Sequence, residues 1–597
     1  MEQVKERNQI EEKYKWNLRD IFQSDEAWEE QFAAVKAALS QFSDFRGTLH
    51  DKQQLKKLFD MEHSLMPILE RLFVYAKMSR DQDNGNDRYV SMCDRAYALL
   101  TACDTETAYI VPELNRLDDD ILLTWSNEQM FEDRSVFLKE IVRNKSHVLT
   151  EGEERLLALS GEMANSYDTI FTMLDDVDMK FSPITLSDGT KTELSHGRYG
   201  LFLQDKDRSI RQQAYESMYE AHIQNINTLA ALYTSSVKKD VFYARARKFS
   251  SVLEGELFSG NIPLAVYDGL IEAIHGGLPA LHRYVALRKK LLSLNEMKMY
   301  DMYVPIVEAD TGTYGYEEAQ KIVKEALAPL GKEYSAVLDR AFHENWIDVF
   351  ETKGKTSGAY SWGAYGTHPY MLLNFQGRLD DVFTLAHEAG HSMHTYFSDQ
   401  ALPYEKAQYK IFVAEVASTV NEVLLLKHLL AATENRTTKA YLLNHFLDQF
   451  RTTVFRQTMF AEFERAAHKA IEDGESLTVN WLNSAYGRLN KLYYSDAVET
   501  DRYIETEWSR IPHFYNCFYV YQYATGFSAA VAIADNILQN GGAAVENYLR
   551  FLSSGGSDFP VELLKIAGID LSKPDAVLSG MKIFEQTLRD FEEMIEK

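Results

Sequence analysis

Two histidines four residues apart are the clearest candidates for chemistry in this sequence. His387 and His391 enclose an acidic residue, Glu388, in the pattern HExxH, and the apolar residues before them indicate a helix. Residues four apart lie on one face of a helix, about 6 Å apart along its axis, so both imidazoles can bind one zinc ion. Glu388 projects from a neighbouring face, where a carboxylate can take a proton from a water that the metal activates. The pattern therefore predicts a catalytic metal centre.

Two histidines on a solvated helix face are the alternative interpretation. The chain has 16 His and 89 acidic residues among 597, so chance would produce a histidine pair with this spacing and an adjacent acid about 0.06 times per chain. Gly390 also stands inside the expected helix, where glycine costs about 1 kcal/mol relative to alanine. We therefore expect another element to approach the helix closely at Gly390.

A catalytic zinc site needs a third protein ligand and an open position for water. Glu415 is the one acid in an otherwise apolar run of helical character, residues 412–418. Because a buried carboxylate needs a partner, a second helix that presents Glu415 to the metal is one interpretation, and a paired structural glutamate is the other. Glu422 lies seven residues further on, on the same face, where it either orients a ligating histidine or remains a solvated charge.

His394 competes with Glu415 for the third ligand position. It shares the face of His387 but lies about 10.5 Å further along a straight helix, which is too far for one metal ion to bind all three histidines. We interpret His394 as a residue behind the ligands or facing the substrate, with a structural histidine as the equal alternative.

Donors of hydrogen bonds are dense in the stretch 510–526. A preorganised Tyr or His aimed at the oxyanion of a tetrahedral intermediate is worth roughly 3–4 kcal/mol. His513, Tyr519 and Tyr523 are the candidates for this role, and an aromatic core is the alternative.

The composition limits the class of protein. With 63 basic and 89 acidic residues the net charge is −26, which disfavours binding to nucleic acid and to anionic membranes. Three cysteines without a CxxC pair fit a reducing compartment. The sequence has no apolar stretch of 18 residues and no apolar segment near its start, so we expect a cytoplasmic protein without a membrane span.

The elements that carry these residues are expected to be mainly α-helical, because 12 prolines and 30 glycines interrupt the chain rarely. The apolar spacing predicts a helix over 263–276, with Gly276 as its stop. An Asp-Gly turn within 179–194 predicts a hairpin. The glycine-rich and aromatic segment 353–366 predicts a loop, followed by a strand over 370–375. We place the boundary between an N-terminal helical domain, 1–200, and a catalytic domain, 201–597, after the hairpin.

Together these motifs resemble the thimet oligopeptidase superfamily of zinc metallopeptidases, and most closely its oligoendopeptidase F branch. The resemblance covers nearly the whole chain and is carried by KWNL at 15–18, HEAGHSMH at 387–394, the run 414–419 and the stretch 513–526. It implies that His387, His391 and Glu415 bind zinc and that Glu388 is the general base. The family also places a histidine and several tyrosines where His513, Tyr519 and Tyr523 stand, with Gly526 in place of a further tyrosine.

The resemblance implies a mostly helical fold of two lobes around a deep channel, with a small sheet or hairpin near the active site. It also implies that the loop 354–366 and the strand 370–375 contact the substrate, the strand by backbone pairing. We expect a zinc endopeptidase with one zinc ion per chain that cleaves short oligopeptides, without nucleic-acid or membrane partners. The oligomeric state stays open.

Two alternatives remain. The first is a zinc carboxypeptidase or another amidohydrolase on the same scaffold, which would need a basic residue such as Lys355, His368 or Arg378 to fix a free carboxylate. The second is a helical peptide-binding protein without catalysis.

Overall fold

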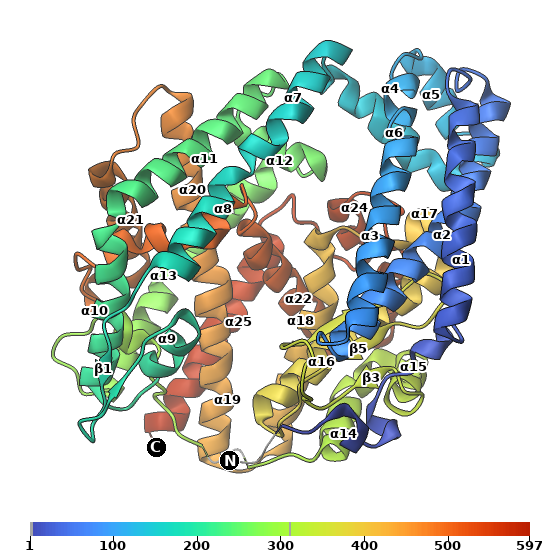
Figure 1. Ribbon diagram of the computed structural model, residues 1–597. Coiled ribbons are helices and arrows are strands. Elements are labelled where there is room, and N and C mark those ends of the chain that lie inside the picture. The colour runs from blue at the N-terminus through green and yellow to red at the C-terminus, as the bar shows by residue number, and fades with distance from the viewer. Residues whose placement is uncertain (1–3, 310–311, 597) are drawn as a thin grey trace. The chain divides into compact units, whose positions relative to one another are not determined.

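The computed structural model describes residues 4–309 and 312–596, and it is 73% helical. The strands of the described residues form one sheet of two strands and one of three (Figure 1). The predicted mainly α class is confirmed. Among the described residues, no helix combines the length and the apolar character that crossing a bilayer requires.

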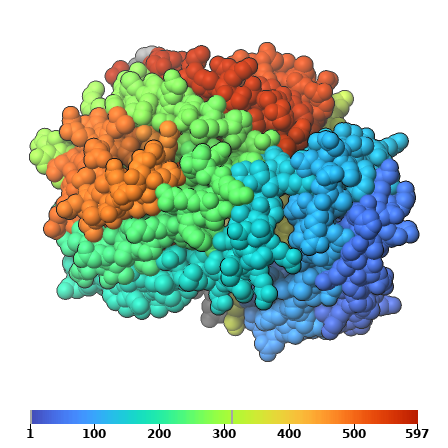
Figure 2. All heavy atoms as spheres, turned by 90° about the horizontal axis from the view of Figure 1, so that it is seen from above, coloured from blue at the N-terminus to red at the C-terminus, as the bar shows by residue number. Residues whose placement is uncertain are grey.

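The chain forms two compact units, each built from three separate segments. Unit 1 consists of Met1–Ser146, Thr311–Leu429 and Ala530–Ile569. Unit 2 consists of His147–Asp310, Leu430–Ala529 and Asp570–Lys597. Within unit 2 the surfaces of the second segment, in orange, and of the first, in green, adjoin each other (Figure 2). The sequence boundary near residue 200 and the channel stay predictions.

The described helices fall into the two units as follows. Unit 1 contains α1 (Asp25–Ala38), α2 (Lys52–Gln82), α3 (Asp87–Thr107), α4 (Ile110–Leu114), α5 (Asp119–Ser126), α6 (Ser135–Asn144), α14 (Tyr316–Leu327), α15 (Gly331–His343), α16 (Leu379–Ala401), α17 (Tyr404–Ala407), α23 (Gly542–Leu552) and α24 (Pro560–Ile566). Unit 2 contains α7 (Glu151–Ala164), α8 (Ser166–Thr172), α9 (His196–Leu203), α10 (Arg208–Gln224), α11 (Ile226–Ala246), α12 (Val252–Ser259), α13 (Leu264–Leu291), α19 (Arg436–Gln449), α20 (Arg456–Glu472), α21 (Val479–Tyr494) and α25 (Asp575–Glu596). Two further helices, α18 (Ile411–Ala432) and α22 (Tyr521–Asn540), contain residues of both units.

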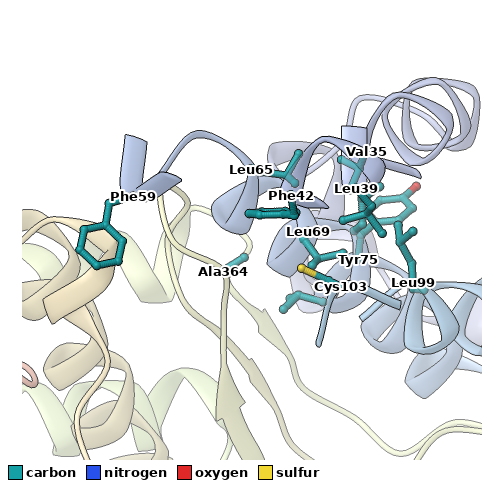
Figure 3. Close-up of a cluster of buried hydrophobic side chains, with 14 of the residues drawn as sticks. Val35, Leu39, Phe42, Phe59, Leu65, Leu69, Tyr75, Leu99, Cys103 and Ala364 are labelled. Atoms are coloured by element: carbon teal, nitrogen blue, oxygen red, sulfur yellow. The ribbon is translucent and has the colours of Figure 1, made fainter. Parts of the chain in front are cut away.

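The core of unit 1 joins the N-terminal helices to the three-stranded sheet. Leu65 and Leu69 of α2 meet Leu99 and Cys103 of α3 in one cluster of buried side chains (Figure 3). Ala364, which lies between two strands of the sheet, belongs to the same cluster. Burial of apolar area thus fixes the sheet to the helices, at roughly 25 cal/mol for each Å² removed from water.

The three-stranded sheet has the order β3-β5-β4, with β3 (Ile347–Asp348), β4 (Tyr360–Trp362) and β5 (Tyr370–Leu372). The strand predicted over 370–375 is therefore present, but it is the central one, parallel to β3 and antiparallel to β4. Because both of its edges are already paired, β5 cannot add a substrate strand, and that expectation was wrong. The edge strand β4 lies within the segment 353–366, which was expected to be a loop.

The two-stranded sheet is the predicted hairpin. Strands β1 (Ile184–Thr185) and β2 (Lys191–Thr192) pair antiparallel around a turn in which Gly189 has a φ of +83°. Glycine adopts this left-handed conformation without steric cost.

The predicted stop at Gly276 was wrong. Helix α13 runs through Gly276 and Gly277 to Leu291. A Cβ atom on Gly277 would lie 2.5 Å from the sulfur of Met581 in α25, so the glycine permits close packing of α25 rather than ending the helix. The glycine at this position therefore reflects tertiary packing, which the local sequence pattern does not reveal.

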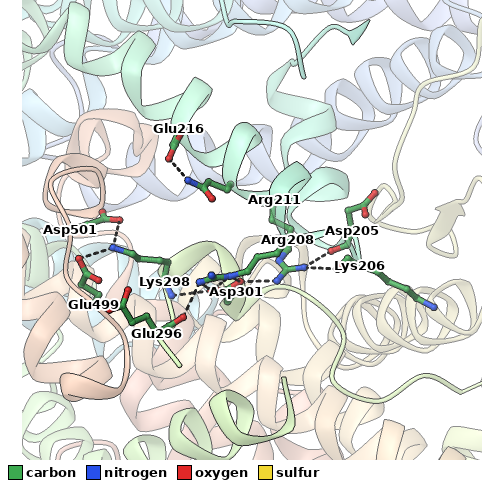
Figure 4. Close-up of polar contacts among 11 residues, drawn as sticks. Asp205, Lys206, Arg208, Arg211, Glu216, Glu296, Lys298, Asp301, Glu499 and Asp501 are labelled. Atoms are coloured by element: carbon green, nitrogen blue, oxygen red, sulfur yellow. Dashed lines mark hydrogen bonds and ion pairs between the residues drawn. The ribbon is translucent and has the colours of Figure 1, made fainter. Parts of the chain in front are cut away.

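A buried ion-pair network fixes the start of α10 in unit 2. Asp301, which has no exposed surface, receives Arg211 Nη2 at 2.7 Å on one oxygen and Arg208 Nη2 at 2.9 Å on the other. The backbone N–H of Lys298 also donates to this carboxylate, at 3.0 Å. Figure 4 shows the two guanidinium groups converging on Asp301. The carboxylate is therefore the common partner of a buried guanidinium group, Arg211, and a partly exposed one, Arg208.

We predict that Asp301→Asn lowers the free energy of unfolding by about 3–5 kcal/mol, because it leaves the buried Arg211 without its countercharge. Urea unfolding followed by circular dichroism measures the loss. The control is Asp268→Asn, which removes a half-exposed pair with Arg465 and should change stability by less than about 1 kcal/mol. Equal losses of unfolding free energy in the two variants would contradict the structural role of the buried Asp301 ion pairs.

Candidate metal centre

Helix α16 presents the HExxH residues from a well-capped, buried position in unit 1. Asp381, in its first turn, accepts the backbone N–H groups of Arg378 at 2.8 Å and Gln376 at 3.1 Å. The residue at the N-cap position itself is Arg378. An acid in the first turn can accept hydrogen bonds from unpaired backbone N–H groups at the start of the helix.

Helix α18 packs directly against α16 at Gly390. A Cβ atom at this glycine would lie 2.6 Å from Ser418 Cα and 2.7 Å from the Ala417 carbonyl oxygen. The close approach predicted at Gly390 is confirmed. The side chain of Asn421 on α18 donates to the Ala386 carbonyl of α16 at 3.0 Å and accepts the hydroxyl of Tyr334 at 3.0 Å. These contacts hold the two helices in one relative position.

His387, His391 and Glu415 form one cluster between these helices. The Nε2 atoms of the two histidines lie 3.1 Å apart. Glu415 Oε2 lies 3.4 Å from Nε2 of His387 and 3.6 Å from Nε2 of His391. A tetrahedral zinc ion with bonds of roughly 2.0–2.1 Å would hold such atoms about 3.3 Å apart. The donor set therefore fits zinc, and the half-exposed Glu415 leaves one side of the cluster accessible.

Both imidazoles are held by their other ring atoms. Glu422 Oε1 lies 2.5 Å from His387 Nδ1, and the ring of His391 hydrogen-bonds to the backbone of Ala414. Burial lowers the pKa of His387, but the hydrogen bond and charge of Glu422 exceed it and raise that pKa to about 9. Burial and the charge of His387 lower the pKa of His391 to about 4. Near neutral pH only His387 therefore carries a proton on the Nε2 atom that faces the other ring.

Glu388 lies beside the cluster in a dry environment. Its side chain is buried, and its Oε2 atom has no hydrogen-bond partner among the described residues. Burial, the largest effect, raises the pKa of Glu388 to about 7, opposed by His387 and by a backbone hydrogen bond from Ser361. A carboxyl group with this pKa can accept and return a proton near neutral pH.

His394 lies apart from the group of ligand atoms. Its ring stacks on Tyr409 with centroids 3.6 Å apart and an interplanar angle of 4°, and it also packs against Phe551. Complete burial lowers its pKa to about 3. Of the two interpretations left open for His394, this environment favours the structural histidine.

His513, Tyr519 and Tyr523 lie together in unit 2. The Tyr523 hydroxyl is 3.5 Å from His513 Nε2, and the rings of Tyr519 and Tyr523 meet edge to face at 5.4 Å. The preceding turn is fixed by Glu507, whose buried carboxylate receives Arg456 at 2.7 Å. Burial, with a smaller effect of Arg456, lowers the pKa of His513. Their role as oxyanion donors stays a prediction.

Several contacts of the centre were missed from the sequence. Ser361 on β4 hydrogen-bonds to Ser392 on α16 at 2.7 Å and, through its backbone, to Glu388. Asn421 had a signal, since it is an amide within an apolar helical run. Ser361 had none, because its neighbours in sequence do not indicate which strand lies at the edge of the sheet.

The basic residues considered for a carboxypeptidase have other partners. Lys355 Nζ is buried and contacts Asp348 at 2.8 Å. His368 stacks on Trp346 at 4.6 Å and reaches Asp20 at 3.2 Å. Arg378 is the exposed member of the three.

Comparison with known proteins agrees with this geometry. The family model described as "Peptidase family M3" matches residues 201–583, and a model described as "Oligopeptidase F" matches residues 113–181. The chain belongs to peptidase family M3. As an M3 peptidase it is a metalloendopeptidase.

This M3 peptidase has close relatives over its full length. Oligopeptidase PepF of Bacillus subtilis (strain 168) is 43% identical over 100% of this chain and 89% of the relative. A putative peptidase from Chlamydophila abortus has a TM-score of 0.93 and 34% identity, covering 99% of this chain and 100% of that one. Oligoendopeptidase-F from Enterococcus faecium has a TM-score of 0.74 and 37% identity, covering 96% and 99%. The resemblance to the oligoendopeptidase F branch is confirmed.

We predict that Gly390→Ala separates α16 from α18, because the added methyl group meets backbone atoms that cannot turn away. Overpacking of this kind costs about 1–3 kcal/mol, and the bound metal should be lost with the ligand geometry. Thermal unfolding and metal analysis measure both effects. The control is Gly269→Ala in α13, where a Cβ meets nothing within 4 Å. If Gly390→Ala matches this control in thermal stability and in metal content, the close contact at Gly390 does not determine the ligand geometry.

We also predict that Glu422→Gln weakens metal binding by about 10–100-fold, because the amide holds the His387 ring less firmly and makes it less basic. Competition with a chromogenic chelator measures the affinity. Glu434→Gln, at an exposed acid just beyond α18, is the matched control. Identical affinities for the two variants would remove Glu422 from the centre.

Proposed function

We propose that this M3 peptidase is a zinc-dependent endopeptidase that hydrolyses internal bonds of short oligopeptides. His387, His391 and Glu415 are the zinc ligands, with one catalytic zinc ion per chain, and Glu388 is the general base. The spacing of 3.1–3.6 Å among the three ligand atoms carries the proposal. The set of two imidazoles and one carboxylate favours zinc, although Mn²⁺ and Co²⁺ also bind such ligands.

Bound zinc supplies Lewis acidity that polarises a carbonyl group and acidifies water. Glu388 takes the proton of the attacking water on its buried carboxylate and returns it to the departing amine. Its pKa of about 7 is suited to both transfers. Glu422 keeps the His387 ring turned so that Nε2 faces the metal. His513, Tyr519 and Tyr523 are proposed as donors to the oxyanion, on the strength of the family pattern.

The edge strand β4 is the proposed binding site for the substrate backbone. It has β5 on one side only, and its central residue, Ser361, hydrogen-bonds to Ser392 of the helix that carries the histidines. The other edge of the sheet continues into the N-terminal segment, since Val349 donates to the Tyr14 carbonyl at 3.0 Å. An extended peptide that adds to an edge strand is held by main-chain bonds, which tolerate many sequences.

Cleavage of internal bonds is favoured over carboxypeptidase activity. Lys355 and His368 are engaged in internal contacts, so of the three basic candidates only the exposed Arg378 is left to bind a free carboxylate. The printed names of the relatives, oligopeptidase and oligoendopeptidase, support oligopeptides as the substrate class. The cytoplasmic location stays a prediction.

The test compares wild type with Glu388→Gln on a quenched fluorescent oligopeptide, with zinc measured in both proteins. We expect equal zinc contents and a loss of activity of about 10²–10⁴-fold in the variant, because only proton transfer is removed. Mass spectrometry of the wild-type products should show cuts at internal bonds.

Other outcomes would replace the proposal. Stepwise release of C-terminal residues would indicate a carboxypeptidase. Zinc-loaded wild type that cleaves nothing in a varied peptide library would favour the peptide-binding alternative. Full activity of Glu388→Gln would exclude Glu388 as the base.

A further inference from the structure

A second cluster of metal-ligand side chains lies within unit 2. Asp240 comes from α11, His468 from α20, and Cys517 from the segment that follows the turn Pro512–Tyr515. His468 Nε2 lies 3.2 Å from Asp240 Oδ2 and 3.4 Å from Cys517 Sγ. The three ligand atoms all lie within 4.8 Å of one another. Residues far apart in the sequence thus direct a carboxylate, an imidazole and a thiol to one point.

The hydrogen bonding of His468 leaves a lone pair at the centre of this cluster. Its Nδ1 atom is 2.9 Å from the Glu464 carbonyl oxygen, which can only accept, so Nδ1 carries a hydrogen. In the neutral ring Nε2 is then an acceptor, and it faces the oxygen of a carboxylate. A proton on one of the two groups, a hydrogen bond from the Cys517 thiol or a metal ion can each satisfy this lone pair. Metal-binding histidines are oriented in the same way, by a backbone carbonyl on the opposite ring nitrogen.

An unpartnered buried carboxylate adjoins the cluster. Glu464 has no exposed surface, and within the described part of the chain its Oε2 atom has no hydrogen-bond partner. Its Oε1 atom accepts the backbone N–H of Phe518, next to Cys517, at 2.6 Å. A buried polar atom without a partner is costly, so a donor or a cation beside Oε2 would be favourable.

The charges near the cluster match a divalent cation. Lys239 contacts Asp240 Oδ1 at 3.0 Å and leaves Oδ2 directed at His468. A divalent ion bound to a Cys517 thiolate and to the Asp240 carboxylate would be neutralised by these two ligands.

A pocket adjoins this cluster at Asp240. It has a volume of about 450 Å³, and its lining includes Asp240, Glu256 and Lys239.

We propose that Asp240, His468 and Cys517 form a second metal site, of the zinc type, with the buried carboxyl group of Glu464 beside it. Thiolate and imidazole ligands select zinc over magnesium and calcium. Binding releases the Cys517 thiol proton to solvent, because the thiolate is the ligand, and His468 binds as neutral imidazole. The ion joins α11, α20 and the segment before α22, so its role is structural. This inference does not depend on the proposed function.

The test uses a His387→Ala/His391→Ala variant, which lacks the histidines of the catalytic cluster. We expect wild type to contain two zinc ions per chain and this variant to retain one, as measured by plasma mass spectrometry. After exchange with Co²⁺, the variant should show thiolate-to-cobalt charge-transfer absorption in the near ultraviolet. The ligands proposed for the catalytic ion contain no sulfur, so this absorption reports the second site alone.

Cys517→Ser in the same background should abolish both the absorption and the remaining ion. Cys103→Ser, at a buried thiol of unit 1, is the matched control and should retain them. If Cys517→Ser does not fold by circular dichroism, the absorption of cobalt-exchanged wild type decides. Its absence, or a Cys517→Ser protein that keeps the ion, would overturn the proposal. Failure of peptide cleavage with the absorption intact would count against the proposed function only.

Discussion

The contact of Gly390 with the backbone of Ser418 is the constraint on which the metal centre depends. No side chain separates the two helices there, so their axes approach as closely as the backbones allow. Only at this distance can Glu415 on one helix reach the histidines on the other, at 3.4–3.6 Å. The Asn421 amide then fixes the register by capturing the Ala386 carbonyl. Ligand geometry is thus a result of helix packing.

Electrostatic environment gives chemically similar groups different tasks in this site. Three carboxylates lie near one imidazole pair. Glu422 hydrogen-bonds to His387, Glu415 is half exposed beside both rings, and Glu388 is buried without a partner for Oε2. The three groups have the same chemical type, so their surroundings give them different roles. Glu422 orients a histidine, Glu415 is the ligand candidate and Glu388 can exchange protons. In both clusters an acceptor on the outer ring nitrogen orients a histidine, Glu422 for His387 and the Glu464 carbonyl oxygen for His468.

The sequence predicts best what a single helix determines. The spacing of His387 and His391 fixes their common face, and a glycine inside a helix indicates a close neighbour. The order of the strands depends on contacts between distant residues, so the central position of β5 could not be predicted. The same holds for the close contact of α13 with α25 at Gly277, which the local pattern around this glycine does not indicate. The cluster around His468 has no local spacing, because its partners lie 49 and 228 positions away in the chain.

The shortness of β4 has a consequence for the assembly of the protein. An exposed sheet edge that can accept a peptide can in principle also accept the edge of another copy, which is how aggregation through strands begins. Three residues, Tyr360–Trp362, offer too few main-chain groups for a lasting pairing between two folded chains. If β4 binds the substrate as proposed, product fragments break few main-chain hydrogen bonds when they leave. An edge of this length offers few main-chain hydrogen bonds to a bound peptide, and equally few to the sheet edge of a second copy of the chain.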